Sequence, residues 1–270
     1  MTWIGAALLG IVQGLTEFLP ISSSAHLVLA RAFLGWNVDE GSFGLAFDVS
    51  LHVGTLLALV GFFRRDIVDI LAALPGAARA QRGPGKVLRL IVIGTIPVVI
   101  AGALAAKWLE EHCRTPQVIA VTLILGAVWL LIAEKFGSRA RREDSLSSTG
   151  AFVTGLAEAT AIVPGMSRSG STISMAMLLG LTRESAARFS FLLGIPAILG
   201  AAVKEAPHII KLGVTAQDGQ LFLLGMTVSA VVGYLTIRFF LRYLAGHSLD
   251  VFAYYRLALA VVTIVWLLMK

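Results

Sequence analysis

Long runs of apolar residues, almost without charged side chains, are the feature that most constrains this chain. Six such runs lie near 45–63, 87–106, 117–135, 187–203, 219–238 and 252–269. Each is close to the roughly 17 to 25 residues that a helix needs to cross the hydrocarbon core of a bilayer. Pro97 and Pro196 fall inside two of them, which membrane helices tolerate because neighbouring groups bond the freed carbonyls. The sequence therefore predicts an all-α integral membrane protein with six transmembrane helices.

The composition excludes the other broad classes of protein. Apolar residues make up 57% of the 270 residues, charged residues make up 14%, and the mean hydropathy is +0.85. A soluble domain carries about a quarter charged residues, so soluble, disordered and disulfide-framework classes are excluded. The long uncharged runs favour helices over a β-barrel, because barrel strands alternate and show no such runs.

Two further apolar segments, 2–34 and 150–181, are too broken to cross a membrane. The first is interrupted by polar residues up to His26, and the second by the run Pro164–Thr172. Each is predicted to be a re-entrant hairpin of helix, polar loop and helix. Non-helical backbone at membrane depth is tolerated only where it is buried in protein or lines a cavity.

The two hairpins resemble each other at an offset of 145 residues. This offset places Gly10-x-x-Gln13 over Gly155-x-x-Glu158, and residues 22–25 over residues 167–170. The chain therefore divides into two repeats, 1–136 and 149–270, joined by the charged linker 137–148 within one integral membrane domain. Each repeat has one hairpin and three crossings, so the second enters from the opposite side. Inverted repeats usually place their site near the bilayer midplane.

The basic residues indicate the orientation in the membrane. The loops 64–89, 135–148, 182–188 and 238–251 hold 14 of the 22 Lys and Arg residues, and the opposite face holds 6. By the positive-inside rule the richer face is cytoplasmic. Both termini and the mouth of the first hairpin are then expected on the outer side of the membrane. The net charge of +6 is therefore a topology signal and no evidence for a nucleic-acid partner.

Ionisable residues at membrane depth are functional candidates because they are costly there. Gln13 and Glu17 are four residues apart and share a helix face. They could hold a divalent cation or orient a water molecule; the alternative is a buried hydrogen-bonded pair. His52, four residues after Asp48, is interpreted as part of a structural pair, with a supporting role at the site as the alternative.

The second polar loop suits a phosphate group. Its glycines let backbone amides approach a ligand, and Arg168 offers planar bidentate donation to phosphate oxygens. A helix that begins after the loop would add its N-terminal N–H groups. The alternative is a packing surface with Arg168 paired to Glu17 or Glu158.

His26 ends the first loop, beside three serines. It could serve phosphoryl transfer as the nucleophile, or as the base that activates Ser23. Arg168 would stabilise charge on the transferring group.

The two motifs, Gly10–His26 and Pro164–Thr172, resemble those of the bacterial undecaprenyl-diphosphate phosphatases, also called bacitracin-resistance phosphatases. The resemblance covers essentially the whole chain. It implies hydrolysis of a C55 polyprenyl diphosphate to the monophosphate with a divalent cation, Mg²⁺ or Ca²⁺. This reaction recycles the lipid carrier of peptidoglycan synthesis and confers bacitracin resistance.

Site residues follow from the resemblance position by position. Glu17 matches the essential acid, Ser23 and His26 match the serine and histidine, and Arg168 matches the phosphate-binding arginine. Gln13 stands where many members have Glu, so the expected cation ligands are Glu17 and Gln13, with one negative charge fewer than a pair of carboxylates. The predicted substrate-binding residues are Ser22, Ser24, Gly165, Ser167, Ser169 and Thr172.

A transporter or flippase of polyprenyl phosphate is the competing hypothesis, because secondary transporters use inverted repeats with broken helices. In that hypothesis Glu17 would bind a coupling ion. The expected partners are the polyprenyl diphosphate and membrane lipids, and a homodimer is compatible with the sequence.

Overall fold

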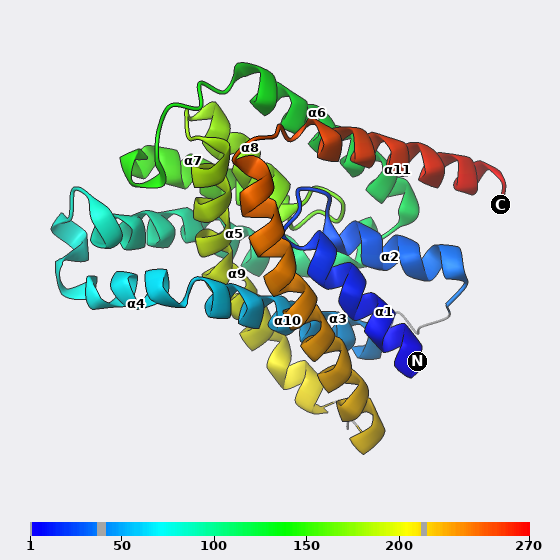
Figure 1. The fold of residues 1–270 in the computed structure, drawn as a ribbon. Coiled ribbons are helices and arrows are strands. Elements are labelled where there is room, and N and C mark those ends of the chain that lie inside the picture. Colours follow the sequence, from blue (N-terminus) through cyan, green and yellow to red (C-terminus); the bar gives the residue numbers. More distant parts are fainter. Residues whose placement is uncertain (1, 37–41, 212–214) are drawn as a thin grey trace.

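The computed structural model describes residues 2–36, 42–211 and 215–270, and these residues form eleven α-helices, two 3-10 helices and no β-strand (Figure 1). The helices are α1 (Trp3–Thr16), α2 (Ser23–Leu34), α3 (Ser42–Phe62), α4 (Arg64–Ala72), η1 (Leu74–Arg79), α5 (Gly83–Cys113), α6 (Pro116–Phe136), η2 (Glu143–Ser145), α7 (Ser148–Thr160), α8 (Arg168–Leu178), α9 (Arg183–Lys211), α10 (Ala216–Leu244) and α11 (Asp250–Leu268). The predicted all-α class is confirmed.

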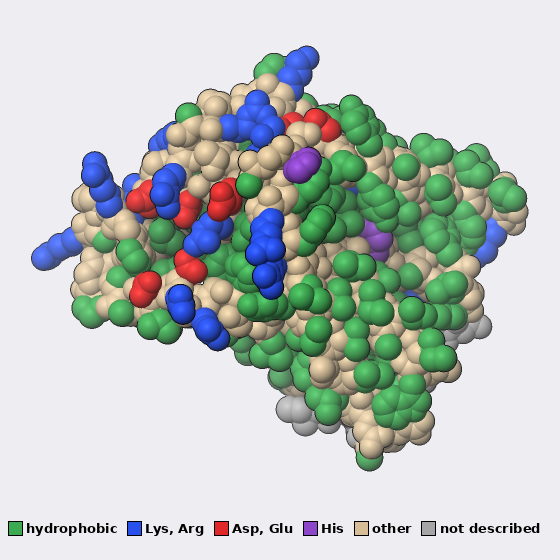
Figure 2. Space-filling model, in the orientation of Figure 1, with side chains coloured by type: hydrophobic (Ala, Val, Ile, Leu, Met, Phe, Trp, Pro, Cys, Tyr) green, Lys and Arg blue, Asp and Glu red, His purple; other side chains and the backbone are tan. Residues whose placement is uncertain are grey.

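Six of these helices are long and apolar enough to cross a membrane, and they are the six predicted from the sequence. They contain the spans Gly44–Phe62, Gly83–Leu109, Pro116–Phe136, Arg183–Pro207, Ala216–Leu244 and Asp250–Leu268. Pro97 lies inside α5 and Pro196 inside α9, as expected. Figure 2 shows the consequence at the surface, which is green with apolar side chains over its lower and right parts. The protein is therefore a multi-pass membrane protein.

Both hairpins form a pair of short helices joined by a polar loop. In the first, α1 has 14 residues and α2 has 12; in the second, α7 has 13 and α8 has 11. Four turns or fewer cannot cross about 30 Å of hydrocarbon. The helix–loop–helix plan is as predicted, and re-entry into the membrane stays a prediction.

The first helix of each hairpin packs against a long helix from the other half of the chain. Helix α1 packs on α10, and helix α7 packs on α5. Glycines make both crossings close: a Cβ on Gly10 would lie 2.7 Å from the Gly225 carbonyl oxygen, and a Cβ on Gly155 would overlap the Gly94 carbonyl oxygen. This is the packing that two inverted repeats would produce. The repeat boundaries and their opposite orientation stay predictions.

An aromatic cluster fixes the end of α1 in the core. Phe18 is fully buried, with its ring centroid 5.5 Å from that of Phe191 in an edge-on contact. The Phe191 ring also lies 6.3 Å from Phe63 and 6.2 Å from Phe240. Such pairs contribute about 0.5–1.5 kcal/mol each beyond burial. Because Phe18 follows Glu17 directly, this cluster also holds the carboxylate in place.

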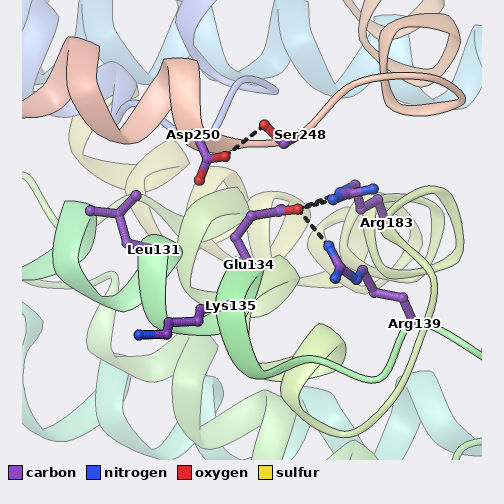
Figure 3. A pocket seen from close by; sticks show the side chains of 7 residues that line it. All are labelled: Leu131, Glu134, Lys135, Arg139, Arg183, Ser248 and Asp250. Carbon is purple, nitrogen blue, oxygen red and sulfur yellow. Dashed lines mark hydrogen bonds and ion pairs between the residues drawn. The ribbon is translucent and has the colours of Figure 1, made fainter.

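The charged linker is anchored by Glu134 at the end of α6 (Figure 3). Arg139 of the linker donates to Glu134 Oε1 at 2.9 Å, and Nε of Arg183 in α9 donates to the same oxygen at 2.7 Å. The backbone N–H of Leu249 donates to Oε2 at 3.3 Å. These bonds line a cavity of about 400 Å³ and tie the linker to helices of the second half.

Candidate active site

The first loop ends in a strained cap on α2. Ser22 has φ 74°, a left-handed value that costs energy for any residue with a Cβ, and its Oγ accepts from the Ala25 N–H at 3.4 Å. The Ser22 and Ser24 hydroxyls lie 3.2 Å apart. The cap therefore gathers hydroxyl groups at the N-terminus of α2.

The second loop repeats this geometry at the positions that the sequence alignment predicts. Ser167 has φ 71° and caps α8, with its Oγ accepting from the Gly170 N–H at 3.1 Å. Its hydroxyl lies 3.3 Å from that of Ser169. Strained backbone of this kind clusters at functional sites. The matching caps agree with the sequence-based interpretation that the two hairpins are repeats of one another.

The two loops meet, and each reaches the backbone of the other through one serine. Ser169 Oγ donates to the Leu19 carbonyl at 2.9 Å, and Ser24 Oγ accepts from the Gly165 N–H at 3.5 Å. Thr172, in the first turn of α8, bonds the Ser190 hydroxyl of α9. The two loops are therefore adjacent, whereas Thr172 is fully buried and bonded to its own helix and to α9; substrate binding by these residues stays a prediction.

Glu17 is the centre of this site, only 6% exposed. Its Oε1 accepts from Arg168 Nη2 at 3.0 Å. Its Oε2 accepts from Ser23 Oγ at 2.6 Å and from Gln13 Nε2 at 2.9 Å. His52 Nε2 lies 3.6 Å from the same oxygen. A carboxylate that holds both a hydroxyl and a guanidinium can accept the hydroxyl proton beside a cationic anion-binding group.

His26 is bonded away from this centre. Its Nδ1 lies 2.7 Å from the Ser22 carbonyl oxygen, and its Nε2 lies 2.8 Å from the Tyr255 hydroxyl. A carbonyl only accepts, so Nδ1 carries a proton, and in the neutral ring Nε2 accepts from Tyr255. The base that contacts Ser23 here is Glu17. Tyr255, which the sequence does not single out, holds the histidine at the edge of the site.

Several buried polar atoms at the site have no hydrogen-bond partner among the described residues. These are Gln13 Oε1, Arg168 Nη1 and both carboxylate oxygens of Glu158. A buried polar group without a partner costs about 1–3 kcal/mol. Unsatisfied groups gathered around one carboxylate indicate a site built to receive a ligand.

Arg256 of α11 holds both loops from behind and is fully buried. Its guanidinium donates to the Pro20 carbonyl of the first loop at 3.2 Å, and to the Gly165 and Met166 carbonyls of the second loop at 2.8 and 3.2 Å. It also donates to the Thr122 and Leu123 carbonyls of α6 at 3.1 and 3.2 Å. The sequence offers one indication of this role. Arg256 lies inside the last apolar run, and a charged residue inside a membrane span is a functional candidate.

A glycine of α9 makes room for Arg168, and this gives a testable prediction. A Cβ on Gly194 would overlap Arg168 Nη1. Gly194→Ala must therefore displace the guanidinium, and we expect kcat/KM for the reaction at this site to fall by about 10²-fold, the cost of a small misplacement. Gly200→Ala in the same helix has open space around its Cβ and serves as the matched control. Activity of Gly194→Ala equal to that of the control would contradict the prediction.

Comparison with known proteins gives full-length matches. A family model described as bacitracin resistance protein BacA matches residues 6–262. The chain is 44% identical over 268 residues to the undecaprenyl-diphosphatase of Rubrobacter xylanophilus, with 98% of each chain covered. It is 45% identical over 269 residues to the undecaprenyl-diphosphatase of Alcanivorax borkumensis, covering 99% of this chain and 100% of the relative. The undecaprenyl-diphosphatase of Moorella thermoacetica is 42% identical over 273 residues, with 99% of each covered.

Proposed function

The chain belongs to the bacitracin resistance protein BacA family, and from this premise we propose that it hydrolyses undecaprenyl diphosphate to undecaprenyl phosphate and inorganic phosphate. The observation that carries the proposal is the contact of Glu17 with both Ser23 and Arg168, which come from opposite hairpins. The product is the lipid carrier of peptidoglycan synthesis, and bacitracin resistance fits the family. The names of the relatives favour this reaction over the flippase hypothesis.

We assign the nucleophile to Ser23. Glu17 accepts the Ser23 proton as Oγ attacks the terminal phosphorus, and the bond from that phosphorus to the bridging oxygen breaks. Undecaprenyl phosphate leaves with the bridging oxygen, which takes the proton from Glu17, and a phosphoserine remains. Water then attacks the phosphorus, and Glu17, again ionised, takes a proton from that water. The bond from phosphorus to Ser23 Oγ breaks, Glu17 returns the proton to Oγ, and inorganic phosphate is released.

Arg168 stabilises the charge on the transferring phosphoryl group. Its Nη1 has no hydrogen-bond partner among the described residues and can donate to a phosphate oxygen. The hydroxyls of Ser22, Ser24, Ser167 and Ser169 surround the two helix N-termini, which favour an anion. His26 lies three residues after Ser23 on α2, and its bonds to the Ser22 carbonyl and the Tyr255 hydroxyl hold it at the edge of the site.

The oxygen atoms present fit a divalent cation. Glu17 offers a carboxylate, and the buried Gln13 Oε1 has no partner among the described residues. These are the hard oxygen ligands that Mg²⁺ and Ca²⁺ use. Within the described residues no cluster of three His, Cys, Asp or Glu side chains is present, and Glu17 and Gln13 are the residues that would hold the cation. Once bound, it would supply positive charge beside the substrate phosphates.

The first test is phosphate release by the purified protein from undecaprenyl diphosphate in detergent. We expect release that falls at least about 10-fold with a chelator and returns with Mg²⁺ or Ca²⁺, because the cation neutralises developing charge. A parent protein that is folded but releases no phosphate would overturn the phosphatase proposal. Movement of polyprenyl phosphate across reconstituted vesicles would then be measured.

The proposed orientation places both termini and the mouth of the site on the periplasmic side. In the view of Figure 2 the basic side chains gather mainly over the upper and left parts, around α4 and the linker seen in Figure 1. This is the face that the positive-inside rule assigns to the cytoplasm. A homodimer stays a prediction that mass measurement in detergent would check.

The orientation can be tested with the single cysteine. Cys113 is half-buried at the end of α5, on the proposed outer face. A membrane-impermeant maleimide should label it in intact cells. In the matched variant, Cys113→Ser with Gln81→Cys, the cysteine lies in an exposed inner segment and should be labelled only after the membrane is permeabilised. The reverse pattern would overturn the orientation.

A further inference from the structure

Glu158 is a buried carboxylate that the reaction above does not use. It lies in α7 of the second hairpin and is 1% exposed. Neither of its oxygens has a hydrogen-bond partner among the described residues. An ionised carboxylate is expensive to bury without a partner, so its position requires an explanation.

Its nearest cation is Arg168. Glu158 Oε1 lies 3.9 Å from Arg168 Nη1, while Arg168 Nη2 bonds Glu17 Oε1 at 3.0 Å. One guanidinium therefore lies between two carboxylates, one from each hairpin. The Gly194 backbone, which packs against Nη1, keeps the guanidinium in this place.

The repeat alignment explains why the second carboxylate comes from this position. Glu158 is equivalent to Gln13 at the offset of 145 residues. The same helical position thus carries an amide in the first hairpin and a carboxylate in the second. Gln13 contacts Glu17, and Glu158 contacts Arg168, so both equivalent positions reach the same charged network.

We propose that Glu158 is the second carboxylate of the active site and supplies the negative charge that Gln13 does not. A bound divalent cation would add a second positive charge, beside that of Arg168, to offset the buried Glu158 carboxylate. The ionised Glu17, Glu158 and Arg168 would then carry −1 together, and the cation would bring the sum to +1. That sum attracts a diphosphate. Without the Glu158 charge the three side chains sum to zero. Arg168 then has only Glu17 as its counter-charge, so the cation would bind Glu17 less strongly. Glu158 is a positioning residue that acts through Arg168.

This inference rests on the proposed cation-dependent hydrolysis, and its test has a readout apart from activity. Binding of Mg²⁺ to the purified protein is measured by calorimetry, and phosphate release is measured against Mg²⁺ concentration. For Glu158→Gln, which is nearly isosteric, we expect Mg²⁺ affinity to fall at least 10-fold and kcat/KM to fall with it. Glu158→Asp should lie between Glu158→Gln and the parent. Glu111→Gln, an exposed glutamate at the end of α5, is the control and should match the parent.

The decisive variant moves the charge back to the first hairpin. Gln13→Glu combined with Glu158→Gln restores the sum of −1, and we expect it to recover most of the Mg²⁺ affinity lost in Glu158→Gln. Parent-like Mg²⁺ binding by Glu158→Gln, or a double variant no better than the single one, would overturn the inference. Loss of folding in both variants would also overturn it, since the role would then be structural. A parent that binds Mg²⁺ but releases no phosphate would instead count against the proposed function alone.

Discussion

Ser23→Ala is expected to lower kcat for phosphate release by about 10³-fold or more, the scale seen when a nucleophile is removed. Ser23 Oγ is the only hydroxyl that the described contacts place on Glu17, at 2.6 Å. Alanine removes the attacking oxygen and leaves little volume to refill, so the fold should persist. The measurement is kcat and KM in detergent beside the melting temperature. We expect kcat to fall, with KM and the melting temperature close to those of the parent.

His26→Gln is the matched comparison, because the sequence leaves Ser23 and His26 as alternative nucleophiles. Both His26 nitrogens are bonded elsewhere, to the Ser22 carbonyl and to the Tyr255 hydroxyl. We therefore expect a smaller loss, about 10- to 10²-fold, the cost of a small misplacement of the neighbouring Ser23. Rapid acid quench should trap an acid-stable phosphoserine. An acid-labile phosphoenzyme that persists in Ser23→Ala and disappears in His26→Gln would assign the nucleophile to His26.

The sequence predicts the architecture well because membrane helices are specified locally. Each apolar run carries its own length signal, so all six spans are found where expected. The hairpins are also local, since Ser22 and Ser167 end their loops and cap the helices that follow. The offset of 145 residues aligns Ser22 with Ser167, and the structure gives these two residues nearly the same φ, 74° and 71°.

The contacts inside the site are less predictable because they depend on how distant helices pack. The sequence leaves Arg168 paired with Glu17 or Glu158 as an alternative to phosphate binding, and the structure places its guanidinium between both carboxylates. The proximity of His52 to Glu17 depends on α3 packing against α1. Asp48 takes a different role, paired with Arg31 and Arg114. Spacing along a single helix cannot select between such partners.

Arg256→Met should be among the most destabilising substitutions in the chain. The sequence alone does not assign Arg256 to the site. All five donor bonds of its guanidinium end on backbone carbonyls, from both loops and from α6. Methionine fills part of the volume and bonds none of these carbonyls. Buried groups left unsatisfied cost about 1–3 kcal/mol each. Even if the surrounding structure partly relaxes, we expect the free energy of unfolding to fall by at least about 3 kcal/mol. Denaturant unfolding in detergent measures this change.

Arg256→Lys tests whether the site needs only the buried positive charge or also the planar guanidinium group with its several donors. Lysine keeps the cation but offers three donors from one point, so it cannot reach α6 and both loops together. If the guanidinium holds the two loops in their relative positions, Arg256→Lys should lose nearly as much activity as Arg256→Met. We expect a loss of about 10²-fold, because Ser23 and Arg168 would be slightly misplaced. Arg238→Met, at an exposed position of α10, should leave stability and activity unchanged. Activity of Arg256→Lys equal to the parent would show that the charge alone is needed, and that the two loops keep their places by their own contacts.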